Sequence, residues 1–237
     1  MQEYRYDMHV HTSETSACGW MPAAFIADLY KKAGYAGFCV SDHLHEKYFS
    51  SLPCRDDWAK CVEMFLSGYR AAKKRGDEIG LDVIMAAEVR FPENDSDYLI
   101  YGIDENFLLK NPYLHRLGHQ AFFDRFKDEI LIVHAHPFRN GNETVYDDCV
   151  HGIEIINGNH RHKNYNDKAF ALTCEKPRLL RCTGSDTHRP GDEAQCALAF
   201  ERRITDSFEF KAAVERKQYK LCAEFDHDIL DAANAAL

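Results

Sequence analysis

Short apolar runs alternate with longer segments of helical periodicity from one end of the chain to the other. The short runs are rich in β-branched and aromatic residues and are bounded by polar or glycine-containing stretches, which is typical of strands. Strands are expected at residues 4–10, 36–41, 81–87, 98–103, 130–135, 152–156 and 179–183. This regular alternation indicates βα units with a mainly parallel sheet, and seven strands favour a barrel over a small open sheet.

The first helix is expected at residues 22–34, because Pro22 suits a first helical turn and Gly34 suits a helix end. Phe25, Leu29 and Ala33 recur on one face of that segment. Further helices are expected at residues 57–75, 112–128, 166–175 and 207–217. No internal repeat, low-complexity tract or long linker interrupts the pattern, so residues 1–237 are expected to form one domain.

Side chains that bind metals follow the predicted strands. Histidine, aspartate or glutamate stands at or just past the end of five apolar runs, as His9, His11, Asp42, His43, Glu88, His134, His136, Asp186 and His188. The carboxyl ends of barrel strands meet at one rim, where the active sites of α/β barrels are built. These residues should therefore converge on a multinuclear metal site of a hydrolase.

Histidine pairs with one intervening residue occur twice, as His9/His11 and His134/His136. Side chains at positions i and i+2 of a strand point the same way, so each pair could face one ion. The alternative for the first pair is a solvent-exposed strand face. His134 could instead be an inner-face histidine that binds no metal.

The carboxylates have competing explanations as well. Glu88 could bridge two cations with its two oxygens, or it could begin an exposed loop and pair with Arg90. Asp186 could bind metal or cap a turn. Asp42 could orient a ligand from behind instead of contacting metal.

Bulk composition narrows the function classes only slightly. Of the 237 residues 45% are hydrophobic, and the formal net charge of -9 disfavours a broad basic surface for nucleic acid. Without a signal peptide or an apolar run long enough to span a bilayer, a cytoplasmic protein is expected. Nine cysteines without CxxC spacing disfavour a disulfide framework and a zinc ribbon.

Taken in order, these motifs resemble those of the polymerase and histidinol phosphatase (PHP) superfamily. The matching segments are residues 7–12 (DMHVHT), 41–43 (SDH), Glu88, 136–137 (HP) and 184–188 (GSDTH). The segment GIEIINGNH also resembles the family strand that carries a Glu-x-x-Asn pair, here Glu154 and Asn157. The resemblance covers nearly the whole chain. It implies a distorted seven-stranded (β/α)7 barrel with two or three zinc, manganese or iron ions that hydrolyses phosphoesters.

The same resemblance implies roles for individual residues. A first metal would be held by His9, His11, Glu88 and Asp186. Glu88 would bridge to a second metal bound by His136. His43 and His188 would hold a third metal.

Two positions depart from the family pattern. Ser16, Ala17 and Cys18 stand where many members carry an Asp or His ligand for the third metal. That site would then be weak or empty, unless Cys18 supplies a soft thiolate instead of being a buried or reactive thiol. Asp104 stands where several relatives have a histidine, and it could be an oxygen ligand to the second metal that favours manganese, or the start of a loop.

The predicted reaction is hydrolysis of a phosphomonoester or phosphodiester by metal-bound hydroxide, with no side-chain nucleophile. Arg139 and Arg189 are candidates for pairing with substrate phosphate, or are surface arginines. A small phosphorylated metabolite or nucleotide is the expected partner, in preference to a long nucleic acid. The alternatives are a noncatalytic metal-binding domain and a metal-dependent amidohydrolase, although no carboxylated-lysine position is evident at the strand ends.

Overall fold

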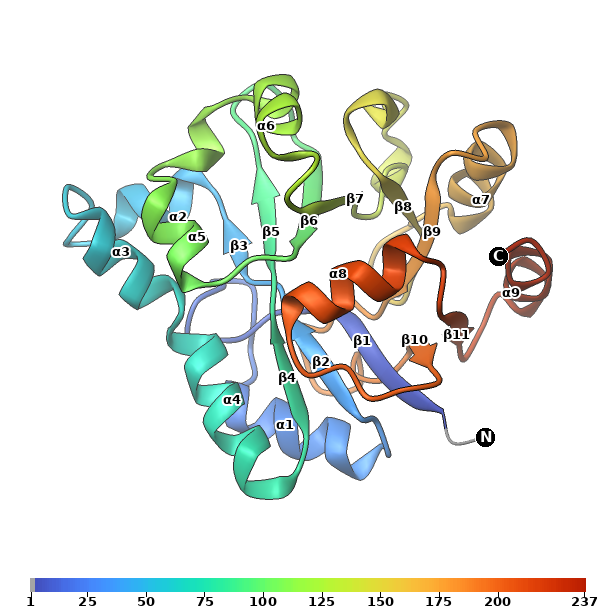
Figure 1. Ribbon diagram of the computed structural model, residues 1–237, viewed down its shortest axis with the longest axis horizontal. Coiled ribbons are helices and arrows are strands. Elements are labelled where there is room, and N and C mark those ends of the chain that lie inside the picture. The colour runs from blue at the N-terminus through green and yellow to red at the C-terminus, as the bar shows by residue number, and fades with distance from the viewer. Residues whose placement is uncertain (1–2) are drawn as a thin grey trace.

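The computed structural model describes residues 3–237 as a mixed α/β fold with two sheets (Figure 1). The first sheet has the order β11-β10-β1-β2-β4, formed by β1 (Tyr4–Val10), β2 (Gly37–Val40), β4 (Asp82–Met85), β10 (Cys196–Phe200) and β11 (Lys220–Ala223). The second has the order β3-β5-β6-β7-β8-β9, formed by β3 (His43–Leu44), β5 (Ala87–Arg90), β6 (Asp97–Tyr101), β7 (Leu131–His134), β8 (Gly152–Asn157) and β9 (Leu180–Gly184).

The two sheets are joined by continuous chain and by one bridge. Only Ala86 separates β4 from β5, so one nearly continuous strand crosses from the first sheet to the second. A parallel bridge between Val10 and Thr187 links the end of β1 to the segment after β9. The carboxyl ends of β1, β5, β7 and β9 are thereby directed to one region of the molecule.

Strand pairing is mixed. The pairs β5/β6, β6/β7, β1/β10 and β10/β11 are antiparallel, while the other named pairs are parallel. The expected α/β architecture is present, but the expected mainly parallel sheet is correct only in part. The seven-stranded barrel stays a prediction.

Each of the seven predicted strands overlaps an observed one, whereas β3, β5, β10 and β11 were not predicted. The charged residues Glu88 and Arg90 interrupt the apolar pattern of β5. The alanines of β10 suit a helix as well as a strand.

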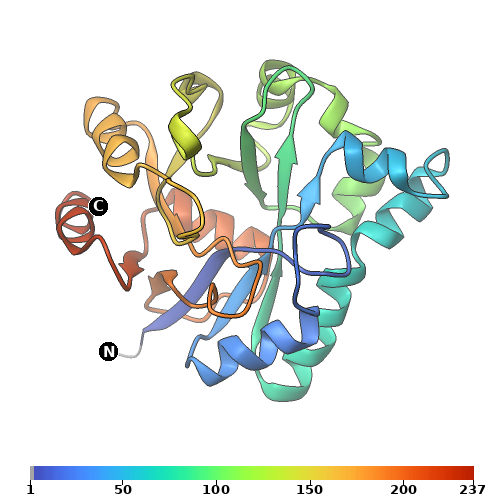
Figure 2. The same ribbon diagram turned by 180° about the vertical axis from the view of Figure 1, so that it is seen from behind.

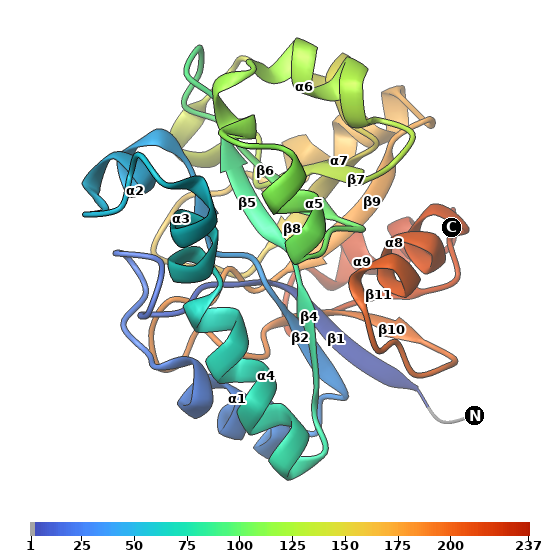
Figure 3. The ribbon, with the colours of Figure 1, turned by 60° about the vertical axis from the view of Figure 1, so that its left-hand side comes forward.

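Two helices pack side by side over one end of the first sheet (Figure 3). These are α1 (Ala23–Lys32) and α4 (Ser67–Ile79). The apolar face expected for the first helix was wrong, since Phe25 is 46% exposed. Ile26 and Tyr30 are buried in its place and pack in a cluster with residues of β2 and β4. Both sets have the spacing of one helical face, so periodicity alone could not separate them.

The remaining helices are α2 (Glu46–Ser51), α3 (Trp58–Phe65), α5 (Glu105–Lys110), α6 (His119–Phe126), α7 (Asn166–Glu175), α8 (Ser207–Glu215) and α9 (His227–Asn234), with short turns η1 (Leu114–Arg116), η2 (Arg139–Gly141) and η3 (Asp147–Cys149). Among residues 3–237, no helix combines the length and the apolar character needed to cross a membrane.

The expected helix at residues 57–75 is divided into α3 and α4 at Leu66. Thr15 occupies the break, because its hydroxyl donates to the Phe65 carbonyl (3.0 Å) and accepts from the Gly68 N–H (3.3 Å). The expected helix at residues 112–128 is likewise shortened, because Gly118 has a positive φ of 82° before α6. Both breaks depend on features outside the local apolar pattern.

One prediction concerns His119, which stacks on Phe91 and Tyr98 and donates from Nε2 to the Cys149 carbonyl (3.0 Å). Burial lowers its pKa from 6.5 to about 4. Its contribution to stability is therefore complete above about pH 6.5 and is lost as the pH falls towards 4, because the unfolded chain takes up the proton first.

Between pH 7.5 and 5, a His119→Phe variant should lose about 2 kcal/mol less stability than the parent protein. Urea unfolding at the two pH values measures the difference. Equal losses in the two proteins would contradict this role.

Candidate metal centre

Side chains from six separate segments meet beyond the carboxyl end of β1. Their potential ligand atoms form four overlapping groups, in each of which the atoms lie within 4.8 Å of one another. The groups are His9/His11/Glu88, His9/His136/Asp186, His11/His43/His188 and His43/Glu88/Asp97. Except for Asp97, every member belongs to the ligand set that the sequence predicted.

Glu88 lies at the middle of this cluster and is almost fully buried. Its Oε1 is 3.2 Å from the Nε2 atoms of His9 and His136. Its Oε2 is 2.8 Å from His43 Nδ1 and 3.4 Å from His11 Nε2. Oε2 has no hydrogen-bond partner among the residues that the structure describes. Two carboxylate oxygens that face different imidazoles are suited to bridging two cations.

Asp186 contributes a second carboxylate to the same space. Its Oδ1 lies 3.5 Å from His9 Nε2 and 3.4 Å from His11 Nε2, and those two nitrogens are 3.0 Å apart. Two imidazoles bound to one zinc ion at about 2.0–2.1 Å have nitrogens roughly 3–3.4 Å apart. Both histidines are 0% exposed, which excludes the alternative of a solvent-exposed strand face. The geometry therefore fits one ion held by these side chains.

The buried carboxylates of the cluster draw positive charge towards their neighbours. Burial lowers the pKa of His9, but the carboxylates of Asp186, Glu154 and Glu88 raise it well above its ordinary value. Burial raises the pKa of Glu88, but His9 and His43 bring it well below its ordinary value. The carboxylates thus favour positive charge on their neighbours, and divalent cations can supply that charge in place of protons.

His9 is oriented from behind by Glu154. Its Nδ1 donates to Glu154 Oε1 (3.0 Å), while Asn157 Nδ2 donates to Glu154 Oε2 (2.8 Å). This contact fixes the tautomer that leaves Nε2 free for a metal. A Cβ at Gly184 would lie 2.5 Å from Glu154 Oε1 and 2.6 Å from His9 Cβ, so only glycine permits this close packing.

Asp42 supports the loop behind His11 and His43. Its Oδ1 accepts from the Thr12 N–H (2.8 Å) and the Ser16 hydroxyl (2.7 Å), and its Oδ2 accepts from the Thr12 hydroxyl (2.7 Å). Ser16 Oγ in turn accepts from the His43 N–H (3.1 Å) and lies 3.4 Å from His11 Nδ1. These contacts correspond to the positioning alternative for Asp42.

Two of the candidate ligands have backbone conformations that are unusual outside glycine. His136 has a φ of 68° and Asp186 a φ of 53°. Left-handed conformations at such residues cost on the order of 1–3 kcal/mol and occur preferentially at functional sites. Surrounding contacts must therefore hold both side chains in place.

Asp104 does not join this cluster. Its Oδ1 accepts from the Phe107 N–H (2.7 Å), so the carboxylate caps α5. The prediction that it binds the second metal is corrected for a topological reason: β6 runs antiparallel to β5, which carries the end of β6 away from Glu88. Asp104 follows that far end.

Asp97, at the start of β6, was missed by the sequence analysis. Its Oδ2 lies 4.0 Å from His136 Nε2, and Arg90 donates to both of its oxygens (2.8 and 2.6 Å). Arg90 therefore pairs with Asp97. The alternative explanation for Glu88 required Arg90 to pair with Glu88, and the structure does not show that pair. The signal in the sequence is the pair of opposite charges, Arg90 and Asp97, which face each other if β5 and β6 form an antiparallel hairpin.

His134 contacts none of the candidate ligands closely enough to orient them. It is fully buried beside Tyr98, and neither ring nitrogen has a hydrogen-bond partner within the described part of the chain. Burial and the nearby His136 lower its pKa to about 3, which keeps it neutral. No metal group contains it.

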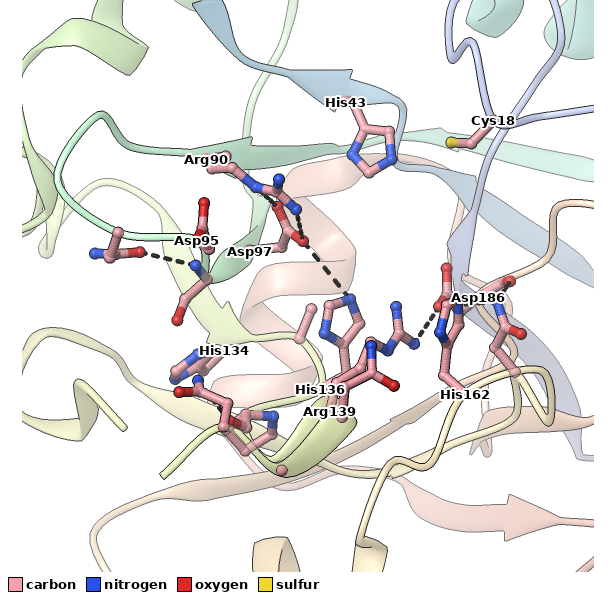
Figure 4. A pocket seen from close by; sticks show the side chains of 18 of the residues that line it. Cys18, His43, Arg90, Asp95, Asp97, His134, His136, Arg139, His162 and Asp186 are labelled. Carbon is pink, nitrogen blue, oxygen red and sulfur yellow. Dashed lines mark hydrogen bonds and ion pairs between the residues drawn. The ribbon is translucent and has the colours of Figure 1, made fainter. Parts of the chain in front are cut away.

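The cluster opens into a cleft of about 900 Å³ (Figure 4). Arginines 90, 139, 161 and 189 line it. Arg139 donates to Asp186 Oδ2 (2.5 Å) and Asn157 Oδ1 (2.9 Å), so its charge is already engaged. The guanidinium of Arg189 lies 3.7 Å from the ring centroid of Trp20, and no carboxylate of residues 3–237 pairs with it. Of the two arginines predicted to bind phosphate, Arg189 is the one available.

Known family sequence models do not match this chain, and neither does any curated protein sequence. Solved structures do match. A two-domain protein of Bacteroides vulgatus, described as containing a predicted PHP-like metal-dependent phosphoesterase, aligns over 94% of this chain with a TM-score of 0.64 and 14% identity. This chain spans only 65% of that protein.

PsfC from Pseudomonas syringae aligns over 100% of this chain and 97% of its own, with a TM-score of 0.62 and 18% identity. An amidohydrolase from Chromobacterium violaceum with bound sulfate aligns over 94% of this chain and 99% of its own, with a TM-score of 0.51 and 14% identity. The chain thus shares its fold with PHP-like proteins, and the resemblance read from the motifs is confirmed at that level.

A prediction tests the support that Glu154 gives to His9. A Glu154→Gln variant should bind divalent metal about 10–100-fold more weakly, because the amide cannot hold the His9 tautomer as a carboxylate does. Competition with a chromogenic chelator measures the affinity. Glu175→Gln, at an exposed position of α7, is the matched control. Unchanged affinity in Glu154→Gln would contradict the proposed support.

Proposed function

We propose that this protein is a metal-dependent hydrolase that cleaves a phosphoester of a small phosphorylated metabolite or nucleotide. The observation that carries the proposal is Glu88, whose two oxygens face different histidines at the base of an arginine-lined cleft. The unpartnered Glu88 Oε2 and the close pair of Nε2 atoms fit a centre of at least two cations.

The ligands divide around the two sides of Glu88. His9, His11 and Asp186 would hold one ion with Glu88. His136 would hold the second, with Asp97 within reach of the same side. Bound divalent ions would polarise a phosphoryl oxygen and lower the pKa of water, so no side-chain nucleophile is required.

The protein's own residues would bind and orient the phosphate. Arg189 stands at the cleft with its only described side-chain partner an aromatic ring, so its N–H groups can turn to an anion. Arg139 instead pairs with Asp186 through one charged hydrogen bond and is itself held by Asn157 and Asn164. This arrangement assigns substrate binding to Arg189 and ligand positioning to Arg139.

A cleft of about 900 Å³ has the size of a small-molecule site, which supports a metabolite or nucleotide over a long nucleic acid. The sulfate in the amidohydrolase of similar fold is a tetrahedral anion, as phosphate is. Among the described residues that line the cleft here, none is a lysine that could be carboxylated. The balance favours phosphoester over amide hydrolysis.

The direct test measures phosphate release from phosphomonoesters, monoester and alcohol release from short phosphodiesters, and amine release from amides, with manganese or zinc and with a chelated control. Chelator-sensitive release of phosphate is expected. Glu88→Gln and Asp186→Asn should each lower the rate at least about 100-fold, because each removes a ligand charge from the centre.

Glu105→Gln, at an exposed residue paired with Arg70, should retain the parent rate. Folded Glu88→Gln protein with undiminished phosphate release would refute the assignment. Amide cleavage without phosphate release would favour an amidohydrolase, and metal binding without any turnover would favour a noncatalytic domain.

A second prediction concerns Arg189. An Arg189→Met variant should raise KM for a phosphorylated substrate about tenfold, because a charged hydrogen bond to the phosphate is lost, and should change kcat less. Arg202→Met, at an exposed arginine paired only weakly with Glu209, is the control. Steady-state kinetics of the three proteins decide the matter, and a KM equal to that of the parent would remove Arg189 from substrate binding.

A further inference from the structure

We propose that Cys18 is a thiolate ligand of the third metal ion that the family resemblance implies at His43 and His188, at the rim of the centre. This inference rests on the metal centre of the proposed function. What it adds is a ligand particular to this chain, a sulfur atom where many family members carry an Asp or His.

The sulfur lies where a ligand is needed. Cys18 Sγ is 3.1 Å from His188 Nε2, and its side chain points towards His43 (Figure 4). His188 Nδ1 donates to the Asp186 carbonyl oxygen (2.9 Å), which leaves Nε2 as the ring nitrogen with a free lone pair. A thiolate and an imidazole bound to one zinc ion at about 2.3 and 2.0 Å lie roughly 3–3.6 Å apart.

Other donor atoms surround this position. Nitrogens of His11, His43 and His188 lie within 4.8 Å of one another. The fully buried Glu88 Oε2 and His43 Nδ1 are 2.8 Å apart, and neither forms a hydrogen bond of acceptable geometry within residues 3–237. A cation beside them would account for two buried polar atoms that lack a hydrogen-bond partner.

The loop that carries Cys18 is held against His188 by the fold. The Trp20 N–H donates to the His188 carbonyl (2.8 Å), which ties the loop after β1 to the segment after β9. Both segments lie on the near side in Figure 2. A Cβ at Gly19 would lie 2.7 Å from the Thr12 carbonyl oxygen, so this tight turn requires glycine next to Cys18.

Cys18 differs from the other cysteines in its hydrogen-bond partner. All nine are free thiols, and within the described part of the chain only Cys18 has an imidazole nitrogen as its hydrogen-bond partner. A thiolate with two imidazoles selects a softer ion such as zinc over manganese or magnesium. The thiol proton is released to solvent when the sulfur binds the ion.

Cobalt(II) provides the spectroscopic test, because thiolate ligation gives an intense charge-transfer absorption in the near ultraviolet. Metal-free protein, kept reduced, is titrated with cobalt while absorption and bound metal are measured. The parent should show the band, and Cys18→Ser should lose both the band and one equivalent of metal. Cys174→Ser, at an exposed free thiol of α7, should retain both.

A second measurement needs no variant. Alkylation of Cys18, followed by peptide mass spectrometry, should slow about tenfold or more when zinc is bound, since a coordinated thiolate is a poor nucleophile. Cys174 should react at the same rate with and without zinc.

The proposal is overturned if cobalt binds to the parent without the band, if Cys18→Ser retains it, or if zinc leaves alkylation of Cys18 unchanged. Phosphoester hydrolysis by the same samples separates the two proposals. Hydrolysis without the band would overturn only the thiolate site, and the band without hydrolysis would overturn only the proposed reaction.

Discussion

A buried carboxylate surrounded by imidazoles is the constraint around which the site is organised. Glu88 is 1% exposed and faces four histidines. Removing an ionised group from water is costly unless compensating charge and hydrogen bonds surround it. Protonated histidines compensate in part, and bound cations would do so more completely.

The sheet register brings the opposing charges to Glu88 without long flexible connections. In the second sheet His43 of β3 stands directly beside Glu88 of β5, and Arg90 stands opposite Asp97 of β6. Backbone pairing on both sides of β5 leaves Glu88 little freedom to move. Glu154 and the Asp42 loop then orient the histidines from behind. Rigid strands therefore provide the preorganisation that metal binding requires.

Strand ends and their histidines could be read from the sequence, because alternation and apolar runs are local signals. The direction of β6 could not be read. Asp104 was assigned because several relatives have a histidine at that position, and Asp97 was missed because the antiparallel β5/β6 pairing that brings it to the cluster is not a local signal. The break between α3 and α4 was also hidden, since Thr15 reaches it from a distant loop. Such errors arise where contacts far along the chain decide local structure.

The near-continuous strand from β4 to β5 has a consequence for how recognition can vary. Because β4 belongs to the first sheet and β5 to the second, this strand joins the two sheets directly. Much of the cleft wall comes instead from residues 93–96, 140–146 and 161–162, which contain none of the candidate ligands. The candidate metal ligands and much of the cleft wall are thus encoded in separate parts of the chain, so exchange of these loops can change which molecule fits the cleft while the metal ligands are kept.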